Sequence, residues 1–149
     1  MALSGLVVLM ASEPTDFSLS LEQLTGLAAR NPDDAPTLMV AAIIKSWKKP
    51  LNQLTDEEVG RLVVQNDGYP YILDLVWPKL EADPLFESGY YPGDVLSNLI
   101  RADCAIWAER PQYQARLEDL YQRALRAPAD HNESFRESLQ LPGSDRAIN

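Results

Sequence analysis

The chain has 149 residues, of which 46% are hydrophobic and 23% are charged, so it has the size and composition of one folded domain and is not disordered throughout. Its 22 acidic and 13 basic residues give a formal net charge of -9, which disfavours direct binding to nucleic acid and favours a basic protein partner, although acidity alone also serves solubility. The single cysteine, Cys104, excludes an internal disulfide and a cysteine metal cluster.

The first residues, MALSGLVVLMASEP, contain a short apolar run that no lysine or arginine precedes, so we do not expect a signal peptide. Residues 6 to 9 could form one short strand. No stretch reaches the roughly 18 apolar residues that a membrane-spanning helix needs. We therefore expect a cytoplasmic protein that does not enter a membrane, with residues 1–17 only loosely attached to the fold.

From residue 18 onward the sequence predicts consecutive helices. Ser20 and Gln23 form a capping box, in which each side chain accepts a hydrogen bond from the other residue's backbone N–H, and Gly26 is placed to end this short helix. The next segment, PTLMVAAIIKSW, starts at Pro36 and repeats apolar residues at helical spacing. We expect this second helix to be well buried.

A second capping box, Thr55 with Glu58, starts the helix predicted for TDEEVGRLVVQN. Asp56 and Glu57 place negative charge at its positive end, which is stabilising. The next predicted helix, YPYILDLVWPKLEAD, contains Pro78. Because proline lacks the N–H that would bond to the preceding turn, we expect this helix to be kinked or shortened there.

Two further helices are predicted, VLSNLI from residue 95 and the amphipathic segment RPQYQARLEDLYQRAL. Beyond Arg126 apolar residues are sparse, so we expect residues 127–149 to be loosely attached or mobile, and a short docked helix around residues 132–140 is the alternative. Proline favours the first position of a helix, where its missing N–H has no intrahelical partner. Four prolines are predicted to open helices in this way: Pro36, Pro70, Pro92 and Pro111. The predicted fold is one all-α domain, a compact bundle of about five to seven short helices with its core over residues 18–126.

No residue pattern points to catalysis. The one histidine, His131, lies in the polar C-terminal segment, so a catalytic triad is all but excluded, and a zinc site with Cys104 would have to recruit carboxylates. No phosphate-binding glycine motif occurs. Acidic pairs such as Asp33 and Asp34 could act as acid and base in a glycosidase, but they fit helix caps and first turns better. We therefore expect no enzyme, no catalytic residue, no metal and no cofactor.

Aromatic residues between positions 69 and 107 could line a small core or form a recognition surface. Trp77 and Trp107 fit the core better. Tyr90 and Tyr91 flank the turn in GYYPGDVL, and both roles stay open for them. Asp94, in the same stretch, lies near the positive end of the next predicted helix, so the stretch is interpreted as a helix start.

Several of these motifs occur in an order that is typical of one protein family. From Leu19 to Arg101 the chain carries LEQLTG, KPLNQLTDEE, QNDGYPYILDL and ADPLFESGYYPGDVL. In this order and spacing the sequence resembles the immunity proteins of bacterial contact-dependent growth inhibition systems. The resemblance implies a small, mainly helical, cytosolic protein that binds the C-terminal domain of a cognate toxin one-to-one and neutralises it.

The toxins of such systems are often nucleases, and acidic side chains that mimic phosphate would suit a cationic active site. On that hypothesis the toxin contacts are expected among residues of the acidic portion that should be exposed. These candidates are Asp33, Asp34, Asp56, Glu57, Asp67, Glu87, Tyr90, Tyr91 and Asp94. The alternative is an acidic helical adaptor that binds a basic protein of its own cell. Neither hypothesis requires direct contact with nucleic acid or a membrane.

Overall fold

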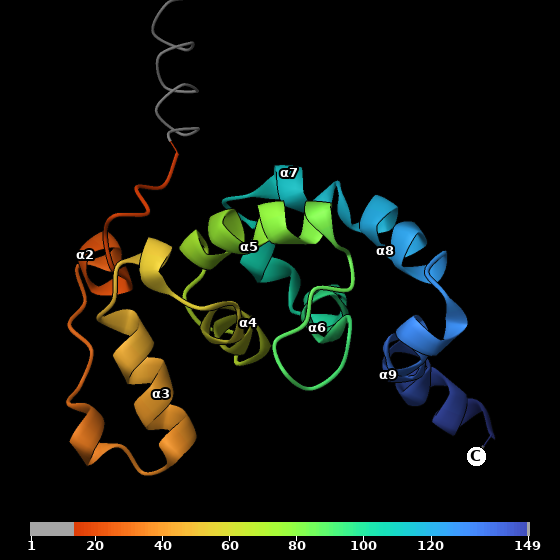
Figure 1. Ribbon diagram of the computed structural model, residues 1–149, viewed down its shortest axis with the longest axis horizontal. Helices are drawn as coiled ribbons and strands as arrows, with labels where there is room; N and C mark the ends of the chain where they lie inside the picture. The colour runs from red at the N-terminus through yellow and green to blue at the C-terminus, as the bar shows by residue number, and fades with distance from the viewer. Residues whose placement is uncertain (1–13, 149) are drawn as a thin grey trace, which may run out of the picture.

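The chain consists of short helices joined by turns, as seen in the computed structural model, which describes residues 14–148 (Figure 1). The α-helices and 3-10 helices (η) are α2 (Leu21–Thr25), η1 (Pro32–Asp34), α3 (Leu38–Trp47), η2 (Leu51–Gln53), α4 (Asp56–Val64), α5 (Tyr71–Ala82), α6 (Asp94–Arg101), η3 (Cys104–Trp107), α7 (Pro111–Gln114), α8 (Leu117–Leu125) and α9 (Ala129–Ile148). Within the described residues the β pairing is limited to one isolated bridge between Ser20 and Pro50. The predicted all-α fold is confirmed, whereas the possible strand at residues 6–9 lies outside the described part.

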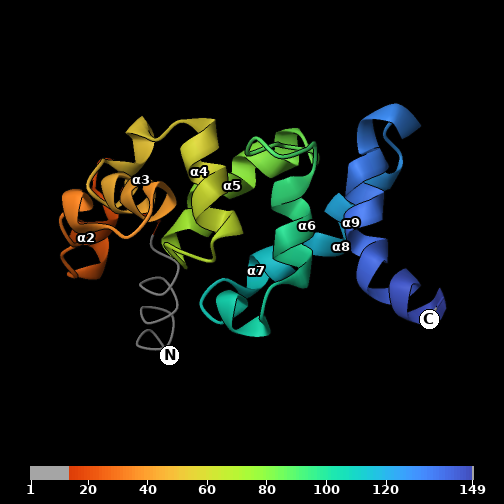
Figure 2. The same ribbon diagram turned by 90° about the horizontal axis from the view of Figure 1, so that it is seen from below.

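The helices follow one another along the long axis of the molecule in nearly the order of the chain (Figure 1). α2 and α3 form one end, α4, α5 and α6 form the middle, and α9 forms the other end; the view from below in Figure 2 shows the same order. None of the helices in this described portion is both long and apolar enough to cross a membrane.

Both predicted capping boxes are present. Ser20 Oγ accepts a hydrogen bond from the Gln23 backbone N–H at 3.2 Å, and the Gln23 side chain accepts one from Ser20 at 2.9 Å. The equivalent distances between Thr55 and Glu58 are 3.1 and 2.9 Å. α2 ends at Gly26, whose φ of 76° is the left-handed conformation expected at this position. These local motifs set where α2 and α4 begin.

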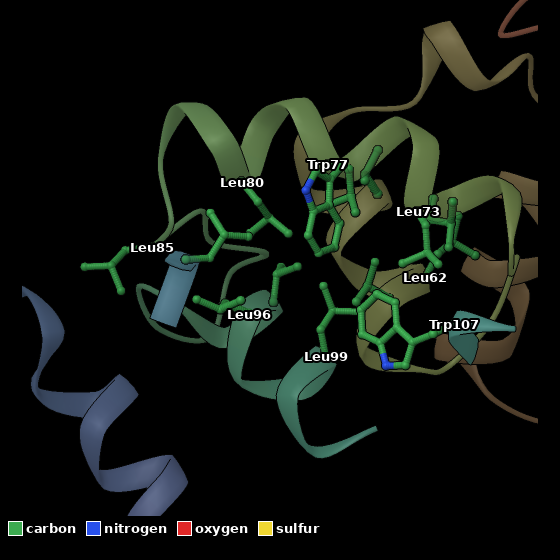
Figure 3. Close-up of a cluster of buried hydrophobic side chains, with 14 of the residues drawn as sticks. Leu62, Leu73, Trp77, Leu80, Leu85, Leu96, Leu99 and Trp107 are labelled. Carbon is green, nitrogen blue, oxygen red and sulfur yellow. The ribbon is translucent and has the colours of Figure 1, made fainter. Parts of the chain in front are cut away.

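The hydrophobic core lies between α4, α5 and α6 (Figure 3). α5 contributes most to it, through Ile72, Leu73, Val76, Trp77 and Leu80. The Trp77 ring meets Trp107 edge to face, with 5.9 Å between ring centroids, and stacks on Tyr113 at 4.6 Å. The predicted core role of both tryptophans is confirmed, and α5 continues through Pro78 to Ala82 without the predicted shortening.

Helix α3 is less buried than its apolar sequence predicts. Ile44 is its one buried apolar side chain, while Leu38 is 91% exposed. The exposure follows from the position of α3 at the end of the molecule, where it packs only against η1 and one side of α4 among its main contacts. Part of its apolar surface therefore faces solvent.

The predicted prolines lie near helix starts, but three of the four are not at the first helical position. Pro111 opens α7 as predicted. Pro70 lies one residue before α5, and Pro36 and Pro92 lie two residues before α3 and α6. Thr37 is the residue that caps α3, because its side chain accepts a hydrogen bond from the third residue of the helix.

Residues 127–140 differ from the loosely attached segment that the sequence predicts. Residues 129–140 form the first part of α9, which packs on α6 and α8. Phe135 is fully buried beside Gly93, where an added Cβ would lie 2.8 Å from the Phe135 ring. The Asn132 side-chain amide donates to the carbonyls of Ala124, Leu125 and Ala127 at the end of α8. One buried aromatic ring and one amide therefore dock a segment whose remaining side chains are mostly polar.

Candidate functional site

A pocket of about 200 Å³ lies between α3, α4 and the loop of residues 83–93, which we call the Tyr90 loop. Its lining side chains and backbone come from Met39, Glu57, Arg61, Ser88, Gly89 and Tyr90. Tyr90 is 63% exposed, and the Glu57 side chain is 69% exposed. We call this the Tyr90 pocket. It combines an aromatic ring, a thioether and a carboxylate at the surface of the protein.

The Tyr90 loop lies directly against α4 because residue 60 is a glycine. A Cβ added to Gly60 would be 2.1 Å from the Ser88 Cβ and 2.8 Å from the Ser88 Cα. Real Cβ atoms do not approach so closely, so only glycine permits this contact. The position of Ser88, which lines the pocket, is therefore fixed by a helix–loop contact that has no room for a side chain at residue 60.

Asp94 binds residues 88 and 90 of the Tyr90 loop through its carboxylate. Its carboxylate accepts hydrogen bonds from the Ser88 backbone N–H at 2.9 Å, the Ser88 hydroxyl at 2.5 Å and the Tyr90 backbone N–H at 3.1 Å. Asp94 is also the first residue of α6, where a negative charge is stabilised by the helix dipole. These bonds fix the backbone of residues 88–90.

The prediction that Asp94 is exposed for a partner is wrong, because the residue is only 1% exposed. Its carboxylate satisfies the loop amides, and so it points inward. Asp94 therefore supports the backbone of the Tyr90 loop from inside the protein and is not itself part of the surface.

The two tyrosines left open by the sequence differ in position. Tyr90 is exposed and lines the pocket. Tyr91 is half-buried, and its hydroxyl lies 2.8 Å from the Ser97 hydroxyl on α6. Tyr90 is therefore the one of the two that is fully available at the surface, and Tyr91 joins the loop to α6.

The remaining candidate acids are spread over several environments. Glu87 is exposed on the Tyr90 loop, and Asp33 and Asp34 are exposed on η1. Asp56 lies 2.7 Å from Lys79 in a solvent-exposed ion pair. Asp67 is half-buried and accepts a hydrogen bond from the Trp47 indole N–H at 3.2 Å, so it has a structural partner.

Of the nine candidates, the structure brings Glu57 and Tyr90 together at one pocket. Sequence reasoning did not include the four other residues that line it, which are Met39, Arg61, Ser88 and Gly89. Met39 was assigned to a buried helix face, and only the partial exposure of α3 places it at the surface. Arg61 follows Glu57 by four residues on α4, a spacing that puts both on one helix face and that could have identified it.

Basic residues of the C-terminal third pair with acids of α5. Arg110 donates two hydrogen bonds to Asp74 at 2.9 and 2.8 Å, and Thr15 and Tyr113 donate to the same carboxylate. Burial alone would raise the pKa of Asp74, but these bonds outweigh it and hold the pKa below its ordinary value.

On the same helix, hydrogen bonds from Arg116 lower the pKa of Glu81, which also lies 3.3 Å from Arg123. The α5 carboxylates are thus paired within the protein. The carboxylates of Glu57 and Glu87, by contrast, are mostly exposed to solvent.

The described side chains include no group of three or more His, Cys, Asp or Glu residues that could hold a metal ion. His131 and Cys104 are both exposed and lie on different elements, α9 and η3. The lining of the Tyr90 pocket offers Glu57 and Arg61 for charged contacts and Met39 for apolar contact.

Comparison with known proteins identifies the family. A family model described as CDI immunity proteins, where CDI denotes contact-dependent growth inhibition, matches residues 23–117. No curated protein and no solved structure matches the chain. The matched range is more than half of the sequence and includes every residue that lines the Tyr90 pocket. The chain therefore belongs to the CDI immunity proteins, and its role is to neutralise a toxin.

Proposed function

We propose that the protein neutralises its cognate toxin by binding the toxin's C-terminal domain non-covalently, one-to-one, in the cytoplasm, through the surface around the Tyr90 pocket. The observation that carries this location is the pocket itself, where an exposed aromatic ring adjoins an exposed carboxylate. Aromatic anchors beside pockets are where binding energy concentrates in protein interfaces. The family membership supplies the kind of partner.

Charge supports a basic toxin surface as the counterpart. The protein has a formal net charge of -9, and the α5 acids are paired internally, so the negative field comes largely from exposed acids elsewhere. Such a field raises the rate at which a basic partner is encountered. If the toxin is a nuclease, carboxylates at this surface would occupy its phosphate-binding positions and block substrate.

A titration with purified toxin domain tests the mode of action. The probe is the C-terminal domain of the toxin encoded beside the immunity gene, and the readout is its activity in the presence of increasing immunity protein. Binding without catalysis predicts that activity falls linearly and ends at one equivalent. Loss of toxin activity at far below one equivalent would mean that the protein acts catalytically, which would overturn the proposal.

The electrostatic component has its own test. Exposed charges are screened beyond about 8 Å at physiological salt, so the association rate should fall steeply as ionic strength rises. A rate that does not change with salt would remove charge steering and phosphate mimicry from the mechanism.

The alternative function is an acidic adaptor for a basic protein of the same cell, because the same exposed acids would attract that protein too. Capture from the producing cell, with and without the toxin gene, distinguishes the two. An adaptor would retain its partner when the toxin gene is deleted, whereas an immunity protein would lose it.

A further inference from the structure

We propose that the Tyr90 pocket receives one arginine or lysine side chain of the toxin, and that this side chain anchors the complex. The inference rests on the proposed function and adds the chemistry of the partner residue and its position on the immunity protein. Three features of the pocket carry it: the thioether and aromatic residues in its lining, a carboxylate beside them and a loop that is already ordered.

The walls suit a long side chain with an apolar stem and a charged end. Met39 lines the pocket from α3, and Tyr90 lines it from the loop. Methylene groups of arginine or lysine pack well on such surfaces, and the face of a tyrosine ring attracts a cation. A short or acidic partner side chain would use neither wall.

The carboxylate of Glu57 supplies the charge. Its Oε1 lies 3.9 Å from the Arg61 guanidinium, which is longer than a hydrogen bond. Its Oε2 faces the loop, 3.6 Å from where a Cβ on Gly89 would be. A cationic group entering the pocket can therefore pair with Glu57 without displacing a hydrogen bond that the carboxylate already makes.

An anionic partner side chain fits less well. Among the residues that the structure describes, Arg61 is the one cation that lines the pocket, and its side chain is only 23% exposed and lies beside Glu57. The adjoining loop carries the exposed acids Asp83 and Glu87, and like charges across an interface are unfavourable. The lining itself holds one acid and one base, and the exposed acids Asp83 and Glu87 add negative charge to the loop that borders it.

The loop is pre-formed, which keeps the cost of binding low. Asp94 fixes the backbone of residues 88–90 through three hydrogen bonds, and Gly60 brings that backbone against α4. Because Tyr90 is carried on a fixed backbone, less conformational entropy is lost when a partner side chain packs on it.

The test measures the affinity of immunity variants for the purified toxin domain. Tyr90→Ala should weaken binding about 10- to 30-fold, the range of an interface anchor, whereas Tyr90→Phe should stay within about threefold because it keeps the ring. Glu57→Gln should weaken binding several-fold and reduce its salt dependence. Glu109→Gln is the matched control, since it removes the same charge from an exposed residue that does not line the pocket.

A double-mutant cycle then identifies the partner residue. Each exposed arginine and lysine of the toxin domain is replaced by alanine and measured against wild-type and Glu57→Gln protein. One of them should show coupling of about fivefold or more, and the others should be close to additive. Circular dichroism of each variant confirms that the fold is intact.

The experiments separate failure of the pocket inference from failure of the proposed function. If the wild type binds and neutralises the toxin but Tyr90→Ala and Glu57→Gln bind equally well, or no toxin cation couples to Glu57, the pocket inference is overturned and the proposed function stands. If wild-type protein does not bind the toxin domain at all, both are overturned.

Discussion

Replacing Gly60 by alanine tests the contact between α4 and the Tyr90 loop. In the middle of an ordinary helix, alanine is about 1 kcal/mol more favourable than glycine, so the substitution would stabilise an isolated α4. Here the added Cβ would lie 2.1 Å from the Ser88 Cβ and 2.8 Å from the Ser88 Cα. Because one of the opposing atoms belongs to the backbone, the clash cannot be relieved by a rotamer change alone.

The expected magnitude follows from these two opposing effects. Overpacking of this kind typically costs about 1–3 kcal/mol, and a clash that includes backbone belongs at the upper end. With the helix propensity gain subtracted, Gly60→Ala should lower the free energy of unfolding by about 2 kcal/mol. Toxin binding should weaken as well, because the loop that carries Tyr90 must move away from α4.

Urea unfolding followed by circular dichroism measures the effect. Gly26→Ala is the control, since an added Cβ there meets no atom within 4 Å but the residue has a left-handed φ of 76°. That variant should lose about 1 kcal/mol from backbone conformation alone. If Gly60→Ala proved as stable as wild type or more stable, the helix and the loop would not be in the contact described.

Three further substitutions probe the buried polar groups and α9. Asp94→Ala should lower the free energy of unfolding by about 2–4 kcal/mol in urea unfolding, because the loop amides lose their acceptor, and a change under about 0.5 kcal/mol would contradict that role. Phe135→Ala should cost about 3–5 kcal/mol by the same assay, whereas a loosely attached C-terminal segment would show almost no effect. Arg110→Ala should cost about 3 kcal/mol at neutral pH, because it leaves Asp74 half-buried without its cation. Since the folded pKa of Asp74 is below its ordinary value, that difference should be full at neutral pH and shrink as pH falls below about 4, and urea unfolding across pH would refute this if the difference were constant.

Local signals in the sequence predicted local structure well. The capping boxes at Ser20 and Thr55 depend on residues three apart, so both could be identified without tertiary information. Trp77 was correctly assigned to the core because it lies on a helix with a strong apolar pattern. The proline pattern marked the neighbourhood of helix starts but missed the exact position at Pro36, Pro70 and Pro92. At α3 the capping residue is Thr37.

Features that depend on packing between distant segments could not be predicted. Leu38 has the same local pattern as a buried residue, and only the position of α3 at the end of the molecule exposes it. Asp94 looked like a surface acid because its hydrogen-bond partners depend on the path of the Tyr90 loop. The sequence likewise predicted Glu57 and Tyr90 as separate candidates, and their meeting at one pocket follows from the contact at Gly60.

The packing of Phe135 on Gly93 has an evolutionary consequence. Phe135 belongs to α9, beyond the range that the family pattern covers, yet it touches the residue from which the Tyr90 loop enters α6. A change in the size of this ring would shift the base of the loop while every residue at the surface stayed the same. If the Tyr90 loop contacts the toxin as proposed, substitutions at Phe135 would alter toxin recognition from behind that surface, where a comparison of surface residues would not find them.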